Sequence, residues 1–383
     1  MIYLDNAATS WPKPESVYQA VDSCLRTVGA SPGRGGHSMA RSASMLVYET
    51  RELLAELLGI ADANQLVFTH NATDAINMAV FGLIKPGDTI VTTAMEHNAV
   101  ARAVRVAETQ GAYIKIIPCS VDGQLDMEAM ETAIKQNPKL VMMTHASNVT
   151  GTVMPVAEVG KLTKAHGVIL LVDAAQTAGV EVIHVQDMHV DILAFSGHKG
   201  LFGPQGTGGL YVKEAIAVRP LRVGGTGSLS ESDTQPEFMP DRLESGTPNT
   251  PGIAGLKAGV EFILATGRSK IQEKEMALTQ LLLAGLREVP GAIIYGKQTA
   301  HERTAVVSFL LAGRDSGEIA HLLDRDYGIA CRSGLHCAPW AHTAIGTLQT
   351  GTVRLSPGYF NSEEEIGAAI AAVKKIAAQG GLA

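Results

Sequence analysis

The chain alternates between short apolar segments and longer segments with helical periodicity. Apolar, β-branched runs are typical of buried strands, and apolar residues spaced three and four apart are typical of helices. The expected strands are 66–68, 89–92, 112–117, 140–145, 168–172 and 192–195. The expected helices are 15–25, 38–58, one that begins at Asp74, 127–136 and 156–166. This alternation predicts an α/β fold with a mainly parallel sheet and helices on both faces.

The last third of the chain follows a different pattern. Residues 219–247 are polar and glycine-rich with little periodicity, which is typical of a functional loop in a compact enzyme. From Pro251 to about Arg287 the periodicity predicts one long helical region that leads into a smaller domain. The elements expected there are strands near 292–295 and 304–309 and helices near 316–326 and 362–378.

Length, charge and cysteine usage limit the kind of protein. A chain of 383 residues is long enough for two domains with substantial cores. A net charge of −7 without a basic cluster argues against nucleic-acid binding. Because there is no long apolar run and no basic-then-apolar leader, we expect no membrane span and a cytoplasmic location. The four cysteines have neither the density of a disulfide framework nor CxxC spacing, so we expect no metal site.

A lysine follows directly after one of the expected buried strands. The strand 192–195 ends in Ser196-Gly197-His198-Lys199, and a glycine-rich turn leads to a second strand at 210–212. An ammonium group in such a place must be desolvated, which lowers its pKa and allows it to form a Schiff base with an aldehyde. Ser196 and His198 are short polar groups suited to hold a phosphate. The alternative is a glycine-rich turn with an exposed lysine.

A carboxylate ends the preceding expected strand. The segment 169–176 reads ILLVDAAQ, with Asp173 at the strand end and Gln176 three residues later. Ligands of open α/β sheets bind at the carboxyl ends of strands. Asp173 therefore suits the partner of a protonated pyridine nitrogen.

This order of motifs resembles a known family along nearly the whole chain. Asp-x-x-Gln, then Ser-Gly-His-Lys and a glycine-rich turn, is similar to the class V aminotransferase group of fold-type I pyridoxal-phosphate (PLP) enzymes. Within that group the chain resembles the cysteine desulfurases, in the Suf-type and selenocysteine lyase branch. The resemblance implies a fold-type I transferase with a large PLP-binding domain, 15–255. It also implies a smaller α+β domain made of 1–14 and 256–383.

The resemblance also implies which residues hold the cofactor. Lys199 bonds the PLP aldehyde, and Asp173 pairs with the ring nitrogen. The other implied contacts are Ala72, Thr73, Ser196 and His198 to the phosphate, His97 on the ring, Asn148 and Gln176 to the phenolic oxygen, and Thr247 from a partner subunit of a homodimer. Taken alone, the turn at Thr73 is also compatible with an ordinary helix cap, and His97 with a structural histidine.

A second chemical centre is expected around Cys337. This cysteine lies in a short polar loop, where Arg332 and His336 are expected to favour the thiolate. The family pattern implies that Cys337 accepts sulfur. The sequence departs from it at Leu335, where a His is usual, and at Ala338-Pro339, where one residue is missing; this leaves the sulfur acceptor in question. Cys331 ends an apolar run and is expected to be structural, with persulfide resolution as an alternative.

Substrate binding is expected from Arg354, because a planar guanidinium grips a carboxylate with two hydrogen bonds. An internal salt bridge to a glutamate is the alternative for this arginine. The resemblance adds Ala8, His37, Asn148 and Arg332 to the substrate site.

The implied activity is a PLP-dependent cysteine desulfurase that converts L-cysteine to L-alanine and leaves a persulfide on Cys337, with Lys199, Cys337 and His97 as catalytic residues. Such activity would mobilise sulfur, for example toward iron–sulfur cluster assembly, through an acceptor protein that the sequence does not identify. Selenocysteine lyase, or another C–S lyase or aminotransferase on the same scaffold, stays open. A non-catalytic scaffold that binds a sulfur carrier is the alternative of another class.

Overall fold

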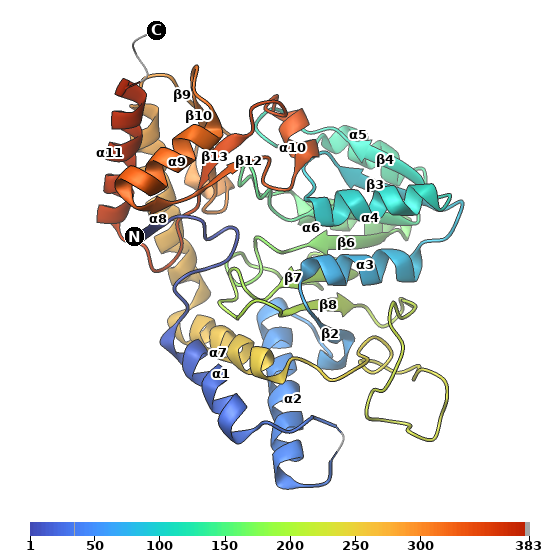
Figure 1. Ribbon diagram of the computed structural model, residues 1–383. Coiled ribbons are helices and arrows are strands. Elements are labelled where there is room, and N and C mark those ends of the chain that lie inside the picture. The colour runs from blue at the N-terminus through green and yellow to red at the C-terminus, as the bar shows by residue number, and fades with distance from the viewer. Residues whose placement is uncertain (34, 380–383) are drawn as a thin grey trace.

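A seven-stranded sheet forms the centre of the protein in the computed structural model, which describes residues 1–33 and 35–379 (Figure 1). Its strands are β2 (Leu66–Thr69), β3 (Thr89–Thr93), β4 (Tyr113–Ile117), β5 (Leu140–Thr144), β6 (Ile169–Asp173), β7 (Ile192–Ser196) and β8 (Gly208–Val212). They lie in the order β2-β8-β7-β6-β5-β3-β4. In this sheet β8 pairs antiparallel with β2 and β7, and the other pairs are parallel. The predicted mainly parallel α/β fold is confirmed.

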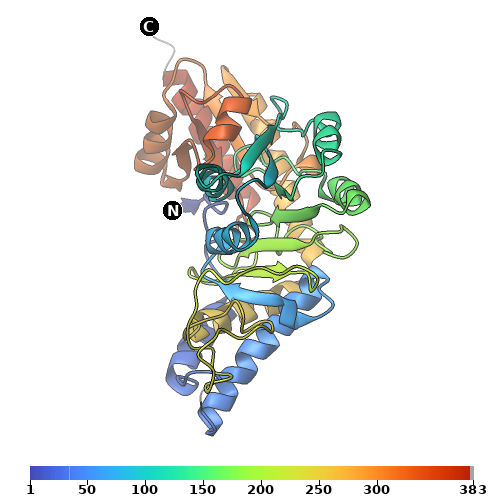
Figure 2. The same ribbon diagram turned by 90° about the vertical axis from the view of Figure 1, so that its right-hand side faces the viewer.

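Helices cover both faces of this sheet, as Figures 1 and 2 show. One face packs on α3 (Ala72–Leu83) and α4 (Asn98–Thr109). The other packs on α2 (Ser38–Leu58), α5 (Met127–Ile134), α6 (Val156–His166) and α7 (Thr250–Thr266). Along β5, Leu140 and Met142 enter the first core, whereas Val141 and Met143 enter the second. Because side chains alternate across a strand, burial on both faces requires the continuous apolar runs seen in the sequence.

Local capping explains where the helices begin and end. Helix α1 is Glu15–Thr27. Helix α2 ends at Leu58 and is capped by Gly59, which has left-handed backbone angles (φ 65°, ψ 36°). The prediction that the next helix begins at Asp74 was wrong by two residues. Helix α3 begins at Ala72 because the Asn71 side chain accepts a hydrogen bond from the Asp74 N–H, 2.9 Å away, and caps the first turn.

The long helical region expected from Pro251 to Arg287 is two helices. Helix α7 ends at Thr266, and α8 (Arg268–Arg287) follows after a single residue. That residue is Gly267, with φ 90° and ψ 118°, which no helix accommodates. Helix α4 was not among the expected elements.

A second, four-stranded antiparallel sheet lies in the C-terminal part. Its strands are β9 (Ala292–Tyr295), β10 (Val307–Leu311), β12 (Arg332–Gly334) and β13 (Thr352–Leu355), in the order β12-β13-β10-β9. Its helices are α8, α9 (Ser316–Tyr327), α10 (Pro339–Ala344) and α11 (Glu363–Gln379). A third core joins α8, α9 and α11 to this sheet and includes Leu4. The N-terminal strand β1 (Ile2–Tyr3) pairs with β11 (Ile329–Ala330).

The division into 15–255 and 1–14 plus 256–383 stays a prediction. Its boundary falls within α7, whose buried residues Leu256, Val260 and Ile263 pack in the core of the large sheet. Residues 213–249 contain no helix or strand and form the long loop beside β2 and β8 in Figure 1. Among the described residues, none of the helices combines the length and the apolar run that crossing a bilayer would require.

Candidate active site

The carboxyl ends of β5, β6 and β7 open into a cavity of about 270 Å³, where ligands of open α/β sheets bind. Most of the residues predicted to form the site line this one cavity. They are Ala8, Ala72, Thr73, His97, Asn148, Asp173, Gln176, Ser196, His198, Lys199, Arg332 and Arg354. The residues come from the N-terminal segment, both sheets and several helix starts, so the complete fold is needed to assemble them.

Lys199 presents a primary amine to this cavity. It follows β7, and its side chain has no hydrogen-bond partner in the part of the chain that the structure describes. Burial lowers its pKa to about 8, although the nearby Asp173 acts in the opposite direction. At pH 7 about a tenth of this amine is therefore unprotonated and can attack a carbonyl group, compared with far less for an ordinary lysine.

Asp173 is the buried carboxylate beside this amine. Its Oδ1 accepts a hydrogen bond from the Ala175 N–H at 2.9 Å. Burial raises the pKa of this carboxyl group, and the Lys199 charge lowers it. Its other oxygen has no hydrogen-bond partner among the described residues, and a carboxylate oxygen there can accept a hydrogen bond from a donor in the cavity.

One end of the cavity is built to receive an anion. Ala72 and Thr73 occupy the first turn of α3, where the positive end of the helix dipole favours negative charge. The Ser196 Oγ accepts a hydrogen bond from the Ala72 N–H at 3.1 Å. His198 Nδ1 is buried without a partner among the described residues, and burial lowers the pKa of this imidazole to about 4. A buried polar atom without a partner indicates a missing ligand group.

His97 is held as a neutral ring at the start of α4. Its Nδ1 accepts a hydrogen bond from the Ala99 N–H at 3.0 Å, which leaves the proton on Nε2. Burial lowers its pKa to about 4, and the Lys199 charge acts in the same direction. At neutral pH this imidazole therefore offers a flat apolar face and one N–H donor.

The two predicted amide contacts are fixed by backbone carbonyl groups. Asn148 Nδ2 donates to the His336 carbonyl oxygen at 2.7 Å, and Gln176 Nε2 donates to the Ala7 carbonyl oxygen at 3.1 Å. Each amide keeps a second N–H for a ligand oxygen.

Arg354 is almost fully buried, yet its guanidinium is only partly paired. Its Nη2 lies 2.7 Å from the Asp5 Oδ1, and its Nη1 donates to the Asn148 carbonyl oxygen at 3.1 Å. Its Nε has no partner among the described residues. The salt bridge considered as an alternative thus exists, with Asp5 in place of a glutamate, and the guanidinium still lines the cavity.

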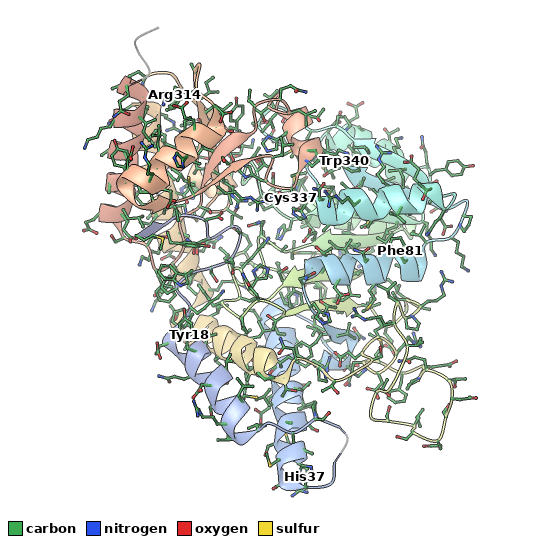
Figure 3. All side chains as sticks on the ribbon, viewed as in Figure 1. Tyr18, His37, Phe81, Arg314, Cys337 and Trp340 are labelled. Atoms are coloured by element: carbon green, nitrogen blue, oxygen red, sulfur yellow. The ribbon has the colours of Figure 1, made fainter. Side chains whose placement is uncertain are left out.

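Cys337 lies in the loop between β12 and α10, with its side chain exposed (Figure 3). Arg332 Nη2 donates a hydrogen bond to its Sγ at 3.1 Å, and Arg332 also lines the cavity. The Cys337 carbonyl oxygen accepts from the Asn98 N–H at 2.7 Å, which fastens the loop to α4. His336 and Cys337 both have positive φ, 47° and 59°, so the loop holds a strained conformation.

The expectation that His336 supplies positive charge was wrong. This side chain is buried, its Nε2 bonds to the Thr352 Oγ1 at 2.9 Å, and burial lowers its pKa to about 2. It is therefore neutral at any physiological pH, and the cation in contact with the Cys337 thiol is Arg332.

Besides Cys337, two predicted site residues do not line the cavity. His37 caps the N-terminus of α2, and Figure 3 shows it at the lower end of the molecule, far from Cys337 in the upper half. Thr247 is exposed and lines a separate groove of about 310 Å³ together with Gly246 and Tyr48. Within one chain, neither residue is near enough to the cavity to contact substrate or phosphate there. Both contacts therefore stay predictions, and both require a second subunit.

The structure adds residues that the sequence reasoning missed. Asp5 pairs with Arg354 across 349 positions of the chain, which no local pattern signals. Asn71 caps α3, and its position three residues before Asp74 was a readable signal. Cys331 is half-buried beside the C-terminal core, and burial raises the pKa of its thiol to about 12. Among the described residues, no group of three or more His, Cys, Asp or Glu is placed to hold a metal ion.

The donors and acceptors of the cavity fit PLP. The free amine of Lys199 matches an aldehyde, and the free oxygen of Asp173 matches a protonated ring nitrogen. The α3 N-terminus and the unpartnered His198 Nδ1 match a phosphate. The neutral ring of His97 matches the face of a pyridine.

Comparison with known proteins agrees with this arrangement. The family model described as aminotransferase class-V matches residues 2–368. A probable cysteine desulfurase of Halobacterium salinarum is 36% identical, with 97% of this chain and 91% of the relative covered. The cysteine desulfurase of an Escherichia coli strain is 35% identical, with 98% and 93% covered.

Solved structures agree as well. An apo cysteine desulfurase from Thermococcus onnurineus is 36% identical, with a TM-score of 0.93, and covers 99% of this chain and 95% of its own. The S-sulfonic acid form of the Escherichia coli cysteine desulfurase CsdA is 29% identical, with a TM-score of 0.86, and 97% and 94% are covered. The chain therefore belongs to the class-V aminotransferase family, within its PLP-dependent cysteine desulfurases.

Proposed function

We propose that this protein is a PLP-dependent cysteine desulfurase. Substrate L-cysteine and the Cys337 thiol would react to give L-alanine and a persulfide on Cys337, so that one sulfur atom moves and no external oxidant is needed. The main support for the proposal is the position of Arg332. This residue lines the same cavity as Lys199 and donates a hydrogen bond to the Cys337 Sγ. The cysteine desulfurase relatives support it.

The cofactor, when bound, supplies an electron sink for the bond electrons of the substrate Cα. Arg354 binds the substrate carboxylate through its unpartnered Nε edge, and Lys199 takes and returns the Cα proton. Asp173 would hold the ring nitrogen by accepting its N–H hydrogen bond, and the neutral His97 side chain would pack on the ring. Arg332 stabilises the Cys337 thiolate for attack on the substrate sulfur. These groups act mainly by orientation in a site of low dielectric constant.

A related activity has one observation in its favour. Cys337 is exposed and does not itself line the cavity, and its loop departs from the family pattern at Leu335 and Pro339. A selenocysteine lyase, or another C–S lyase or aminotransferase, would use the cavity without this thiol. The Arg332 contact favours the desulfurase over these alternatives.

The assembly and cellular setting belong to the same proposal. A homodimer would bring Thr247 and the loop that ends at His37 toward the cavity of the partner subunit. A cytoplasmic location suits the four cysteines, none of which is in a disulfide. An acceptor protein would then take the sulfur from the exposed Cys337.

Replacement of Cys337 tests the proposed function. Wild-type protein with PLP should convert L-cysteine to L-alanine, and mass spectrometry should find one added sulfur on the Cys337 peptide. Cys337→Ala should lower alanine formation at least about a hundredfold, because a nucleophile is lost, while Cys331→Ala should stay near the wild-type rate. Undiminished alanine formation by Cys337→Ala would contradict persulfide formation at this residue.

A further inference from the structure

The N-terminal segment makes contacts with the reactive lysine that the chemistry above does not use. The His198 carbonyl oxygen accepts hydrogen bonds from the Thr9 Oγ1 at 3.0 Å and the Ser10 N–H at 3.1 Å. It also accepts one from the Lys13 Nζ at 2.9 Å. The Lys199 carbonyl oxygen accepts from the Ser10 Oγ at 2.9 Å. The peptide group on each side of the Lys199 Cα is thus held from outside its own loop.

Lys13 is an unusual residue for such a contact. Its ammonium is half-buried, and no carboxylate lies within ion-pair distance in the part of the chain that the structure describes. Burial lowers its pKa to about 8. Because a desolvated cation without a counter-charge costs stability, its presence calls for a compensating role.

The hydrogen-bond directions show what the ammonium does. Lys13 Nζ lies 2.7 Å from the Ser10 Oγ, which can only accept from it. The Ser10 hydroxyl proton is therefore left for a backbone carbonyl oxygen, and that of Lys199 at 2.9 Å is nearer than that of His198 at 3.3 Å. One cation orders both neighbouring carbonyl groups, directly at His198 and through Ser10 at Lys199, and charge assistance strengthens both bonds.

The loop after β7 needs such support. It contains Gly197, Gly200, Gly203 and Gly206, and Phe202 has a positive φ of 58°. Glycine-rich backbone has many accessible conformations, so the loop alone specifies the direction of the Lys199 side chain poorly. The same N-terminal segment supplies Ala7 and Ala8 to the cavity wall, so it is already fixed beside the lysine.

We propose that Lys13 is a positioning residue for Lys199: together with Ser10 it holds the peptide groups around the reactive lysine so that its amine reaches the cofactor and the substrate Cα. Lys13 makes no contact with the reacting atoms in this account. Only the kinetic test of this inference, the rate of alanine formation, rests on the proposed function.

Two readouts test the inference on the holoenzyme. In Lys13→Met, kcat for alanine formation from L-cysteine should fall about tenfold or more, because small misplacements of reacting groups are costly, while KM changes little. Visible circular dichroism per bound cofactor should also fall, because it reports how rigidly the lysine orients the chromophore. Lys13→Arg, which keeps a charged donor, should recover most of both signals. Lys161→Met, which removes an exposed lysine on α6, is the matched control and should match wild type.

The possible results distinguish a failure of the Lys13 inference from a failure of the proposed function. Wild-type kcat and dichroism in Lys13→Met would overturn the inference. If that variant does not fold, Ser10→Ala decides by the same two signals, and unchanged values there overturn it. If wild-type protein forms no alanine, the proposed function fails, and the dichroism of the variants still decides the role of Lys13.

Discussion

At the scale of single residues, Glu96 is a fully buried carboxyl group behind the cavity, between the cavity-lining residues His97 and Thr144. Its Oε1 accepts hydrogen bonds from the Thr93 Oγ1 at 2.6 Å and the Thr144 N–H at 3.0 Å, and its Oε2 has no partner among the described residues. Through these bonds Glu96 links the segment after β3 to the end of β5. Val91 and Val141 are the last residues that pair between these two strands, so the link lies past the end of their ladder. Burial raises its pKa to about 8, and the charge of Asp173 acts in the same direction.

This pKa predicts a stability that depends on pH. Between the ordinary pKa of a glutamate, 4.5, and about 8, the folded protein keeps a proton on Glu96 that the unfolded chain releases. The stabilisation is therefore complete below pH 4.5 and is lost as the pH rises to about 8. Relative to Glu96→Gln, which cannot ionise, the wild-type free energy of unfolding should fall by on the order of 4–5 kcal/mol across this range. Urea unfolding at several pH values measures the difference.

The two proteins are compared by how their free energies of unfolding change with pH, and not by the absolute values. Glutamine also changes the absolute stability, because its side chain adds an N–H group where Glu96 has an oxygen. Parallel curves for the two proteins from pH 5 to pH 8 would mean that Glu96 is ionised throughout.

Single residues also show how far sequence reasoning reached into the site. Residues at strand ends, such as Asp173 and Lys199, were predictable because their chemistry is foreign to a buried strand. Asp5 and Lys13 were not, because their partners lie 349 and 185 positions away and neither belongs to a distinctive motif. The charge state of His336 was mistaken because burial, which opposes its protonation, is not visible in a loop sequence.

At the scale of elements, most strands and helices were predictable from periodicity, and the errors lie where one residue decides. The region from Pro251 to Arg287 has helical periodicity throughout, and the break between α7 and α8 depends on the backbone of Gly267 alone. An isolated glycine inside a helical pattern is often tolerated, so the pattern did not exclude a continuous helix.

Alanine substitution tests the role of that glycine. Gly267 has φ 90° and ψ 118°, and nothing lies within 4 Å of an added Cβ, so Gly267→Ala probes backbone strain without a steric clash. We expect a loss of about 1–3 kcal/mol in the free energy of unfolding. Gly328→Ala is the matched comparison, because Gly328 is equally open and lies in the milder left-handed region (φ 64°, ψ 33°). A smaller loss for Gly267→Ala than for Gly328→Ala would contradict the strain argument.

At the scale of the whole molecule, the active site depends on contacts between parts that are distant in sequence. Arg354 and Arg332 come from the C-terminal sheet, whereas Lys199 and Asp173 come from the large sheet. The resemblance implied that these residues meet, but the sequence alone could not give the geometry. The positions of His37 and Thr247 show the limit of a single chain, since neither reaches the cavity.

The proposed homodimer would place these two residues near the partner's cavity, and it makes a prediction. The groove that contains Thr247 is also lined by Tyr48 of α2, an exposed aromatic residue. Sedimentation should give twice the chain mass of 40.3 kDa. Tyr48→Glu should shift the protein toward monomer and lower its activity, because a charge opposes burial at an interface. Tyr113→Glu, at an exposed site on β4, is the control, and a monomeric wild-type protein would refute the dimer.

The central claim is that the Lys199 amine bonds covalently to the PLP aldehyde. Protein supplied with PLP is reduced with borohydride, digested and mapped by mass spectrometry. We expect one pyridoxyl-phosphate label per chain, on Lys199, and none in Lys199→Ala. A label on another lysine, or no label on correctly folded wild-type protein, would contradict it.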